Sequence, residues 1–511
     1  MNDKIYKKTD DSNSKTNFFL NGISTIIICA IFCITVLILL SGCGKRKGIG
    51  TVLGTITVDA GDYDRINTPI HYHCRTTDIF GDPKKFRREG FFHYIDEAAD
   101  LSLLRDNHLV LIEEGGAKSR INAQWDLEVN FDWEQLGDGR WENVTGKGAL
   151  VWLLEGKTQK GTKRLFKLVL EPGIAPSSPF TIEEDIKKKN LLVKYKDCSV
   201  LRYNYGIVQQ TEGNSGLYDR AGYIHPVWTP SGKIITGDFS PEHIMQRGIF
   251  FAWKNIMVDK KEIGGFWELG EEPGRILPDR FGPSIIRGPV FTDVVVFNKG
   301  DVKGKIYFKE FCVIKIYGLP EENVWLFDMY ILQEPVNPER PVVRPTETTT
   351  ATVIVKGKVM RITEEQPKGT ISMTIPKFQY GGIAFRGVSD WLSKDVSLEV
   401  LTSEGKNRMN ADSTQARWID YSGPVEKEWG GITIFDHPLN QRYPTPLRVH
   451  PELPYFCYAF VQNEPYVISS ESTLGLIYRF LVHNGHPNKE LNERFAQDFV
   501  NPPEILWEPI E

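Results

Sequence analysis

The chain has 511 residues, of which 41% are hydrophobic and 25% charged, as in ordinary globular proteins. This length exceeds what one core ordinarily uses, so we expect two folded units. The formal net charge of −5 shows no basic excess, so a nucleic-acid partner is not expected.

The chain begins with the features of an export signal. Lysines precede the apolar run 26–40, and the small residues that follow it stand where a signal peptide is cut. The stretch Leu40-Ser41-Gly42-Cys43 resembles the lipobox of bacterial lipoproteins, in which the cysteine is lipidated and becomes the new N-terminus. The alternative is an uncleaved anchor, because the span from Phe18 to Leu40 is long enough to cross a bilayer. Both interpretations tether the chain in the cell envelope outside the cytoplasm, in the periplasm or at the outer membrane.

Strand patterns dominate the rest of the chain. Short β-branched and aromatic runs, several of them alternating, fill residues 50–175 and predict a small N-terminal β-domain. The stretch 81–105 interrupts them as an insertion that we expect to be partly helical. A Pro-rich and charged stretch at 176–190 predicts a linker, and strands resume over 191–505.

The second region predicts a large antiparallel β-sandwich. It shows no β-α-β alternation and no Gly-rich phosphate loop after a strand, so nucleotide chemistry is not expected. The polar stretch 333–350 lies inside this region, and we expect a long loop there at the rim of the sandwich. Residues 488–500 have helical spacing and are expected to pack against the sheet edge. The predicted fold class is therefore all-β, a small β-domain followed by a large antiparallel sandwich.

Residues 240–253 place reactive side chains directly before a strand that we expect to be buried. His243 and Arg247 would share one face of a helical turn, with Glu242 beside them. Gly248 then lets the chain enter the strand. A site held at the end of a rigid strand is better positioned than one on a free loop. The alternative is a surface turn with an incidental histidine.

Three further strand ends carry polar side chains. Trp267 stands beside Glu268, a combination that suits a sugar because the ring stacks on indole while the carboxylate accepts hydroxyl hydrogen bonds. Arg386 ends another strand, where it could hold a carboxylate of a ligand or form a structural ion pair. Asp436 and His437 directly follow a fourth strand. Together the four strand ends predict one polar pocket at an end or face of the sandwich.

No metal or cofactor is expected. His71 and His73 would lie on one face of a strand, but no third ligand is in view. Cys312 and Cys457 lie in apolar runs without zinc spacing, which favours buried free thiols over a disulfide. Neither a G-x-S-x-G elbow nor an H-E-x-x-H motif is present, so the common serine-hydrolase and zinc-protease signatures are absent.

The order of several stretches resembles a known family. They are AGDYDRINTP, YNYG, GYIHPVWTPSGKIIT, HIMQRGIFFAW, FWELG, GGIAFR, GITIFDHPLN and YRFLVHNG, spread over residues 50–500. This set resembles the uncharacterised bacterial family labelled "methane oxygenase PmoA-like". The resemblance implies a β-rich protein related in architecture to sugar-acting supersandwich proteins, including mutarotase-like and polysaccharide-lyase domains. A bundle of transmembrane helices is not expected, because the one long apolar segment lies at the start of the chain.

Members of that family often carry a His-rich run before Arg-Gly, of the type D-H-x-H-H-R-G. Here the run contains Glu242, His243, Met245, Gln246 and Arg247, so one histidine remains. This departure argues against a metal or two-histidine mechanism. His243 and Arg247 are then the pair that matches the family best.

A carbohydrate-active enzyme, either a lyase or a hydrolase, is slightly favoured by these residues. A lyase would use Arg247 or Arg386 to neutralise a uronate carboxylate. Its base would be His243 or Tyr223. A hydrolase would need two carboxylates across the scissile bond, and the available ones are Glu242, Glu268 and Asp436.

Two alternatives remain open. A non-catalytic glycan-binding lipoprotein would use Trp228, Trp253 and Trp267 as stacking surfaces. A structural envelope protein would use the polar strand ends as an interface. In the first case, as for the enzyme, the partner is a saccharide or polysaccharide, and Arg247 and Arg386 indicate an acidic one.

Overall fold

The computed structural model describes most of the chain beyond residue 49. It covers residues 50–80, 107–209, 216–336 and 348–510, with short gaps inside these ranges. The predicted export signal with Cys43 lies outside the described residues, and so does nearly all of the insertion predicted at 81–105. Within the described part, no helix combines the length and the apolar character needed to span a membrane.

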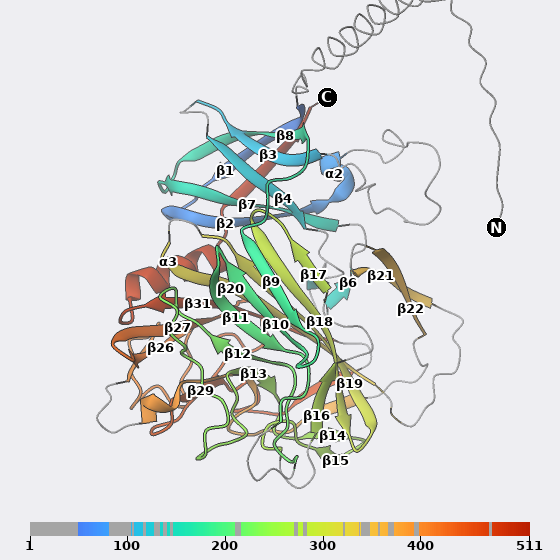
Figure 1. The fold of residues 1–511 in the computed structure, drawn as a ribbon, viewed down its shortest axis with the longest axis vertical. Helices are drawn as coiled ribbons and strands as arrows, with labels where there is room; N and C mark the ends of the chain where they lie inside the picture. Colours follow the sequence, from blue (N-terminus) through green and yellow to red (C-terminus); the bar gives the residue numbers. More distant parts are fainter. Residues whose placement is uncertain are drawn as a thin grey trace, which may run out of the picture. The chain divides into compact units, whose positions relative to one another are not determined.

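The first sheet joins the two ends of the described chain. Its seven strands lie in the order β2 (Arg65–Arg75), β7 (Lys147–Thr158), β4 (Arg120–Asp126), β3 (Asn107–Glu113), β8 (Lys163–Pro172), β1 (Thr51–Asp59) and β32 (Glu504–Pro509). The sheet curls towards a barrel around an apolar core that includes Ile56, Val58 and Trp152 (Figure 1). Strand β32 pairs with β1, so the last strand of the chain completes the sheet that the first strand begins.

Two larger antiparallel sheets form the sandwich. The eight-stranded sheet has the order β28 (Leu447–Val449), β29 (Tyr455–Tyr458), β24 (Gly382–Arg386), β13 (Ile249–Ala252), β12 (Tyr223–Val227), β11 (Cys198–Asn204), β10 (Asn190–Tyr195) and β9 (Phe180–Asp185). The nine-stranded sheet has the order β16 (Gly274–Pro278), β18 (Phe291–Val302), β19 (Lys305–Tyr317), β20 (Val324–Pro335), β31 (Leu474–Asn484), β27 (Glu428–Asp436), β26 (Trp418–Val425) and β25 (Glu399–Thr402), with β17 (Ser284–Arg287) also beside β18. Both sheets contribute to one apolar core, across which the Trp253 indole donates to Gln333 Oε1 at 2.7 Å. The prediction of an all-β fold with a large antiparallel sandwich is confirmed.

Smaller elements complete the described chain. They are a four-stranded sheet of β15 (Lys261–Gly264), β14 (Ile256–Val258), β23 (Ser372–Ile375) and β30 (Tyr466–Ser469), the pairs β21 (Thr348–Val355) with β22 (Lys358–Glu365) and β5 (Trp133–Gln135) with β6 (Trp141–Asn143), and the helical segments α2 (Thr76–Phe80), η4 (Ser389–Leu392) and α3 (Lys489–Val500). Helix α3 agrees with the helical spacing of 488–500, and Asn488 caps it by accepting from Leu491 N.

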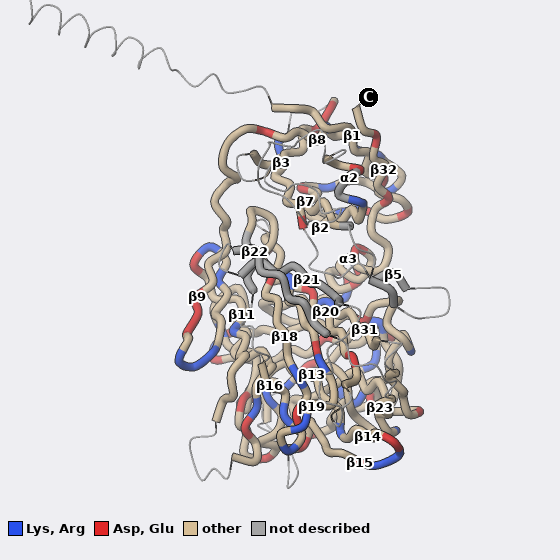
Figure 2. The backbone as a smooth tube through the Cα atoms, turned by 90° about the vertical axis from the view of Figure 1, so that its right-hand side faces the viewer, with Lys and Arg blue, Asp and Glu red and all other residues tan. Residues whose placement is uncertain are grey.

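Two stretches that the sequence predicts as connections contain strands. Strand β9 lies within the predicted linker 176–190 and pairs with β10, where charged residues crowd the hairpin (Figure 2). The predicted rim loop 333–350 is described mainly at its ends, where β20 finishes and β21 begins. Pro-rich and charged composition therefore did not exclude strand pairing at β9.

Four buried charges face one another across the nine-stranded sheet. Asp293, Lys315, Asp328 and Arg479 are cross-strand neighbours on β18, β19, β20 and β31, and we call them the charge ladder. Each is less than 5% exposed, and Arg479 donates to both oxygens of Asp328 at 2.7 and 2.9 Å. Lys315 also donates to Asp126 of β4, so the ladder binds the first sheet to the sandwich.

A second buried network joins the nine-stranded sheet to helix α3. The carboxylate of Asp420 contacts His483 Nε2 at 3.1 Å and accepts from Thr433 and Asn492. Burial alone would lower the pKa of His483, but the charge and hydrogen bond of Asp420 outweigh it and raise that pKa. In the same way, burial would raise the pKa of Asp420, but His483 holds it below its usual value.

The His483–Asp420 pair should make the free energy of unfolding depend on pH, and His483→Gln should remove that dependence. Because the pKa of His483 is raised above 6.5, its stabilisation is full below about pH 6.5 and is lost as the pH rises through the raised value. Because the pKa of Asp420 is lowered below 3.8, its own contribution is full above about pH 3.8 and is lost only in stronger acid. We expect His483→Gln to cost roughly 3 kcal/mol at pH 6 and less at pH 9, measured by urea unfolding.

The matched control is His486→Gln. His486 is an exposed histidine that contacts Glu399 at 3.2 Å, and an exposed pair of this kind contributes under about 1 kcal/mol. If His483→Gln lowered the free energy of unfolding equally at pH 6 and pH 9, the charged pair of His483 with Asp420 would be contradicted.

Candidate functional site

One end of the eight-stranded sheet gathers several of the predicted residues. Because neighbouring strands are antiparallel, the end of β24 at Arg386 lies beside the start of β13 and the start of β29. The end of β28 lies next to β29, and His450 follows it directly. Segments distant in sequence therefore meet at this end of the sheet.

The segment before β13 is a closed loop, which we call the 237–248 loop. Gly248 N donates to Gly237 O at 2.8 Å, and Arg386 of β24 bonds to both glycines through its backbone. Gly248 has a φ of 51°, and a Cβ there would lie 2.0 Å from Ile224 O, so the closure requires glycine. Two successive turns, at Ser240–His243 and His243–Gln246, stand where the sequence predicts a helical turn.

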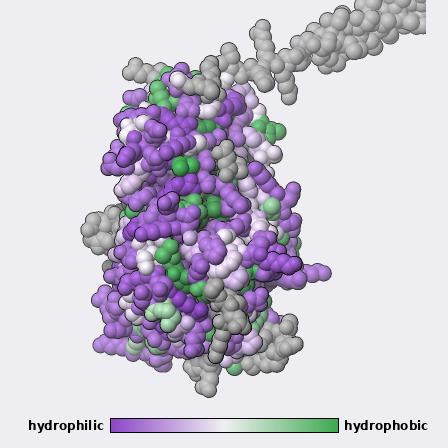
Figure 3. Space-filling model, turned by 90° about the vertical axis from the view of Figure 1, so that its left-hand side faces the viewer, coloured by the Kyte–Doolittle hydropathy of each residue, from purple (hydrophilic) through white to green (hydrophobic). Residues whose placement is uncertain are grey.

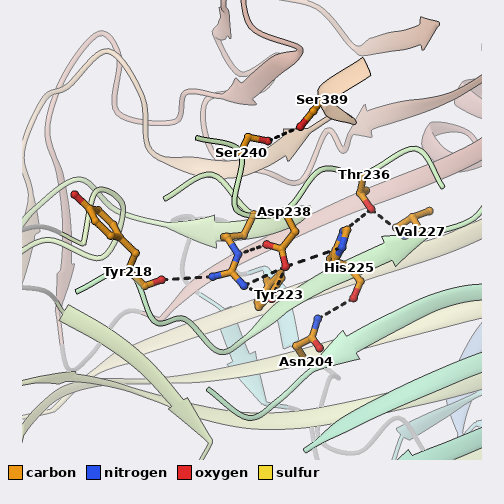
Figure 4. A network of polar contacts seen from close by, with 10 residues as sticks. Asn204, Tyr218, Tyr223, His225, Val227, Thr236, Asp238, Ser240 and Ser389 are labelled. Atoms are coloured by element: carbon orange, nitrogen blue, oxygen red, sulfur yellow. Dashed lines mark hydrogen bonds and ion pairs between the residues drawn. The ribbon is translucent and has the colours of Figure 1, made fainter. Parts of the chain in front are cut away.

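Arg247 points into the protein rather than towards a ligand. It is fully buried and donates to both oxygens of Asp238 and to the hydroxyl of Tyr223. Tyr223 in turn donates to Asp238 Oδ2 at 3.1 Å (Figure 4). Burial, and then the Asp238 charge, raise the pKa of Tyr223, so this residue is not the base that the lyase hypothesis assigns to it.

Arg386 also forms an internal pair. It is fully buried and donates to Gln246 Oε1 at 3.0 Å and to the carboxylate of Glu242, and its Nε has no hydrogen-bond partner among the described residues. The structural ion pair is therefore the alternative that the structure shows. Glu242 lies on the exposed side of the loop.

Five polar side chains come together beside these pairs, and we call them the His243 cluster: His243, Lys254, Glu268, Tyr380 and His450. The rings of His243 and His450 have centroids 6.0 Å apart, and the buried His243 Nδ1 has no hydrogen-bond partner within the described part of the chain. Glu268 accepts hydrogen bonds from Lys254 Nζ and from the Tyr380 hydroxyl. Glu268 and His243 are also within electrostatic range of each other.

The charges of the cluster follow from these contacts. Burial alone would raise the pKa of Glu268, but the bonds from Lys254 and Tyr380 hold it below its usual value. Burial first, and then Arg448 and His243, lower the pKa of His450 to about 4. At neutral pH the cluster thus offers an ionised carboxylate and a neutral imidazole.

The predicted stacking tryptophans are mostly inside the protein. Trp253 and Trp267 are at most 2% exposed, and the Trp267 ring packs 4.8 Å from Phe250. Trp228 is half-buried beneath the guanidinium of Arg202. The half-exposed rings near Glu268 are those of Tyr380 and Phe378, of which Tyr380 packs 4.9 Å from Trp267.

Asp436 and His437 belong to another part of the fold. Asp436 is buried and accepts from Asn440 at 2.7 Å and from the backbone of Thr445 at 2.7 Å. Burial raises its pKa to about 6, whereas burial and Arg479 lower the pKa of His437 to about 4. The His437 ring packs against Phe499 of α3. Of the four predicted strand ends, the structure thus brings together those that carry His243 and Glu268. Arg386 lies behind them, and Asp436 and His437 lie elsewhere.

The described residues contain no group of three or more His, Cys, Asp and Glu side chains that could hold a metal. His71 and His73 stack on each other, and His71 Nε2 contacts the Tyr317 hydroxyl at 2.9 Å. In the described chain Cys312 and Cys457 are free and buried.

Sequence reasoning missed three members of the cluster, Lys254, Tyr380 and His450. His450 directly follows a strand, as the predicted candidates do, so the same criterion would have found it. Tyr380 precedes Gly381 and Gly382, whose φ values of 134° and 132° only glycine tolerates. That glycine pair was the available signal for a tight turn presenting a ring.

We expect an NMR titration to find the His450 imidazole neutral down to about pH 4. Arg448→Gln should raise this pKa, because it removes a neighbouring positive charge, without restoring the ordinary value that burial also opposes. Arg202→Gln serves as the control, since that guanidinium lies over Trp228. A pKa near 6.5, or one insensitive to Arg448→Gln, would show that the ring is solvated.

Comparisons with known proteins place the chain in a family. No curated protein matches it. A crystal structure of a protein in the glycosyl hydrolase family 38 from Enterococcus faecalis is distantly similar, with a TM-score of 0.32 and 8% identity over 90% of this chain and 47% of that chain. The chain spans less than half of that protein, and a likeness this distant carries no argument about function. The model of the "Family of unknown function (DUF6807)" matches residues 190–497. This match covers more than half of the sequence, and the chain therefore belongs to the DUF6807 family.

Proposed function

We propose that the chain is an exported, lipid-anchored protein that binds a saccharide at the His243 cluster. The observation that carries the proposal is the juxtaposition of an ionised carboxylate, two imidazoles and half-exposed aromatic rings at one end of a rigid sheet. Sugar hydroxyls both donate and accept hydrogen bonds, while the C–H face of a sugar ring packs on aromatic rings.

The individual groups suit these two kinds of contact. His450 Nδ1 accepts from the backbone of Glu452 and Leu453 at 3.1 and 2.9 Å, so the neutral ring carries its proton on Nε2 and can donate there. Glu268 supplies acceptor oxygens. Phe378 and Tyr380 supply the apolar surface that the sequence assigned to Trp267.

The pairing of charges favours a neutral saccharide. Arg247 and Arg386, which would have neutralised a uronate, already bind Asp238 and Glu242. Lys254 binds Glu268 in the same way. At these three side chains an acidic sugar would have to displace a carboxylate, and two of the pairs have a fully buried arginine.

The remaining parts of the proposal come from the sequence. Lipidation at Cys43 would hold the protein at the membrane, in the periplasm or at the outer membrane. The net charge of −5 supports a partner other than nucleic acid. No cofactor is part of the proposal.

Catalysis is the second candidate, favoured by the proximity of His243 to Glu268. A glycosidase needs one carboxyl group with a raised pKa as its acid, and the pKa of Glu268 is lowered. For a lyase, Tyr223 is not available as the base, and Arg247 and Arg386 are not available to neutralise a carboxylate of the substrate. The structural-protein hypothesis has little support on the face seen in Figure 3, which is mainly hydrophilic with small separate apolar groups.

Substitutions at Glu268 and Tyr380 test the binding site. We expect Glu268→Gln to weaken the affinity for the best neutral oligosaccharide about tenfold, as the loss of charge-assisted hydrogen bonds predicts. Tyr380→Ala should weaken it by a similar factor, through lost stacking. Calorimetry on a panel of neutral and acidic oligosaccharides measures both effects. Glu426→Gln, which breaks an exposed Glu–Lys pair with Lys233, is the matched control. Equal affinities for all three variants would exclude the cluster.

Mass spectrometry on the same panel separates binding from turnover. Incubation with the soluble chain that begins after Cys43 should return the neutral oligosaccharides unchanged. Products that have gained water would instead show a hydrolase, and unsaturated products a lyase.

A further inference from the structure

Two buried arginines contact two of the segments that carry the His243 cluster, those of His243 and Glu268. Arg247 lies within the 237–248 loop, which presents His243. Arg220 donates from Nη2 to the carbonyl oxygens of Phe266 and Trp267 at 2.7 and 3.0 Å, immediately before Glu268. Each arginine therefore fixes the backbone next to one member of the cluster.

Both arginines also make contacts through the segment 216–223, and we call Arg220, Arg247 and this segment the arginine bracket. Arg220 is part of that segment, and Arg247 donates to the carbonyl oxygen of Tyr218 at 3.4 Å and to the hydroxyl of Tyr223 (Figure 4). The segment thus connects the loop of His243 to the loop of Glu268. The segment 380–386 joins the same two loops from the other side, through Tyr380 on Glu268 and Arg386 on Gln246.

Burying these two charged side chains costs free energy, and this argues against a role in stability alone. Burial, and then the charge of Arg247, lower the pKa of Arg220 to about 9, so Arg220 is a buried cation at neutral pH and lies close to a second buried guanidinium. Asp238 pairs with Arg247, whereas Arg220 depends on carbonyl oxygens. Buried charges of this kind are often replaceable by apolar side chains without loss of stability.

The 237–248 loop also holds an unfavourable backbone conformation. Phe239 has a φ of 50°, in the left-handed region that a bulky residue rarely adopts. Its ring lies 3.4 Å beneath the Arg247 guanidinium, and this stacking holds the conformation in place. Local strain that the surroundings maintain is found at sites where geometry matters.

We propose that Arg220 and Arg247 are positioning residues that together fix His243 relative to Glu268. The inference rests on the saccharide-binding function proposed above, and it adds the device that sets the geometry of that site. Neither arginine contacts the ligand. The planar guanidinium of Arg247 spans both oxygens of Asp238 and the Tyr223 hydroxyl, which the single nitrogen of a lysine cannot do. Arg220 makes both of its bonds from Nη2, and the nitrogen of a lysine there ends one bond short of that position.

The test uses Arg220→Lys and Arg247→Lys in the chain that begins after Cys43. Arg479→Lys is the matched control, because Arg479 is equally buried and makes the same two-point pair with Asp328, in the charge ladder. Three readouts are taken: the melting temperature, the 15N imidazole signals of His243 and His450, and the calorimetric affinity for the best neutral oligosaccharide of the panel.

We expect all three variants to lower the melting temperature to a similar extent. Arg220→Lys and Arg247→Lys should also shift the imidazole signals of His243 and weaken the affinity about tenfold, whereas Arg479→Lys should change neither. Should a lysine variant fail to fold, Phe239→Leu, which removes the stacking and keeps the bulk, should give a smaller change in the same direction.

Imidazole signals and affinity that stay at the values of the Arg479→Lys control would overturn the proposal. Shifted signals with an unchanged affinity would also overturn it, since the moved residues would then not be part of the site. Shifted signals in a chain that binds no member of the panel would support the positioning role and refute saccharide binding. The two proposals therefore fail in distinguishable ways.

Discussion

Charged side chains on the face of the nine-stranded sheet have to be paired, and the rest of the fold is arranged around this requirement. Removing one partner of a buried pair costs about 3–5 kcal/mol, so Asp293, Lys315, Asp328 and Arg479 hold four strands in one register. Lys315 also donates a hydrogen bond to the carboxylate of Asp126 in the first sheet. The sandwich and the first sheet are thus joined by the same set of charges.

The same requirement explains the character of the candidate site. Around the His243 cluster, the arginines bind carboxylates or carbonyl oxygens inside the protein, and Lys254 binds Glu268. Arg247, Arg386 and Lys254 are therefore already paired inside the protein, beside the hydrogen-bonding groups of the cluster. Arg247 and Arg386, which the sequence predicted to bind substrate, are instead internal supports, because each meets a carboxylate of the 237–248 loop.

The sequence predicted the strand-rich architecture well because alternation and β-branched runs report local burial directly. It singled out His243 because that residue precedes the apolar run of β13, and Glu268 because it stands beside Trp267 in a Gly-rich loop. It could not predict the direction in which Arg247 or Arg386 points, because that depends on Asp238 and Glu242 meeting them after folding. Trp267 failed as a stacking surface for the same cause: an aromatic residue in a Gly-rich loop looks exposed until Phe250 and Tyr380 cover it.

The extent of the family match adds a last constraint. Residues 190–497 contain nearly all of the sandwich and most of α3, but no strand of the first sheet. Yet Asp126 of that sheet pairs with Lys315, and Arg65 pairs with Asp498 at the end of α3, both within the buried interior. Within 190–497 alone, Lys315 would keep its weaker contact to Asp293 at 3.8 Å. The first sheet in this chain is therefore part of the pairing that stabilises the sandwich, and Ala149, Val151 and Leu153 of β7 also join the apolar cluster that contains Val290 and Leu326 of the sandwich.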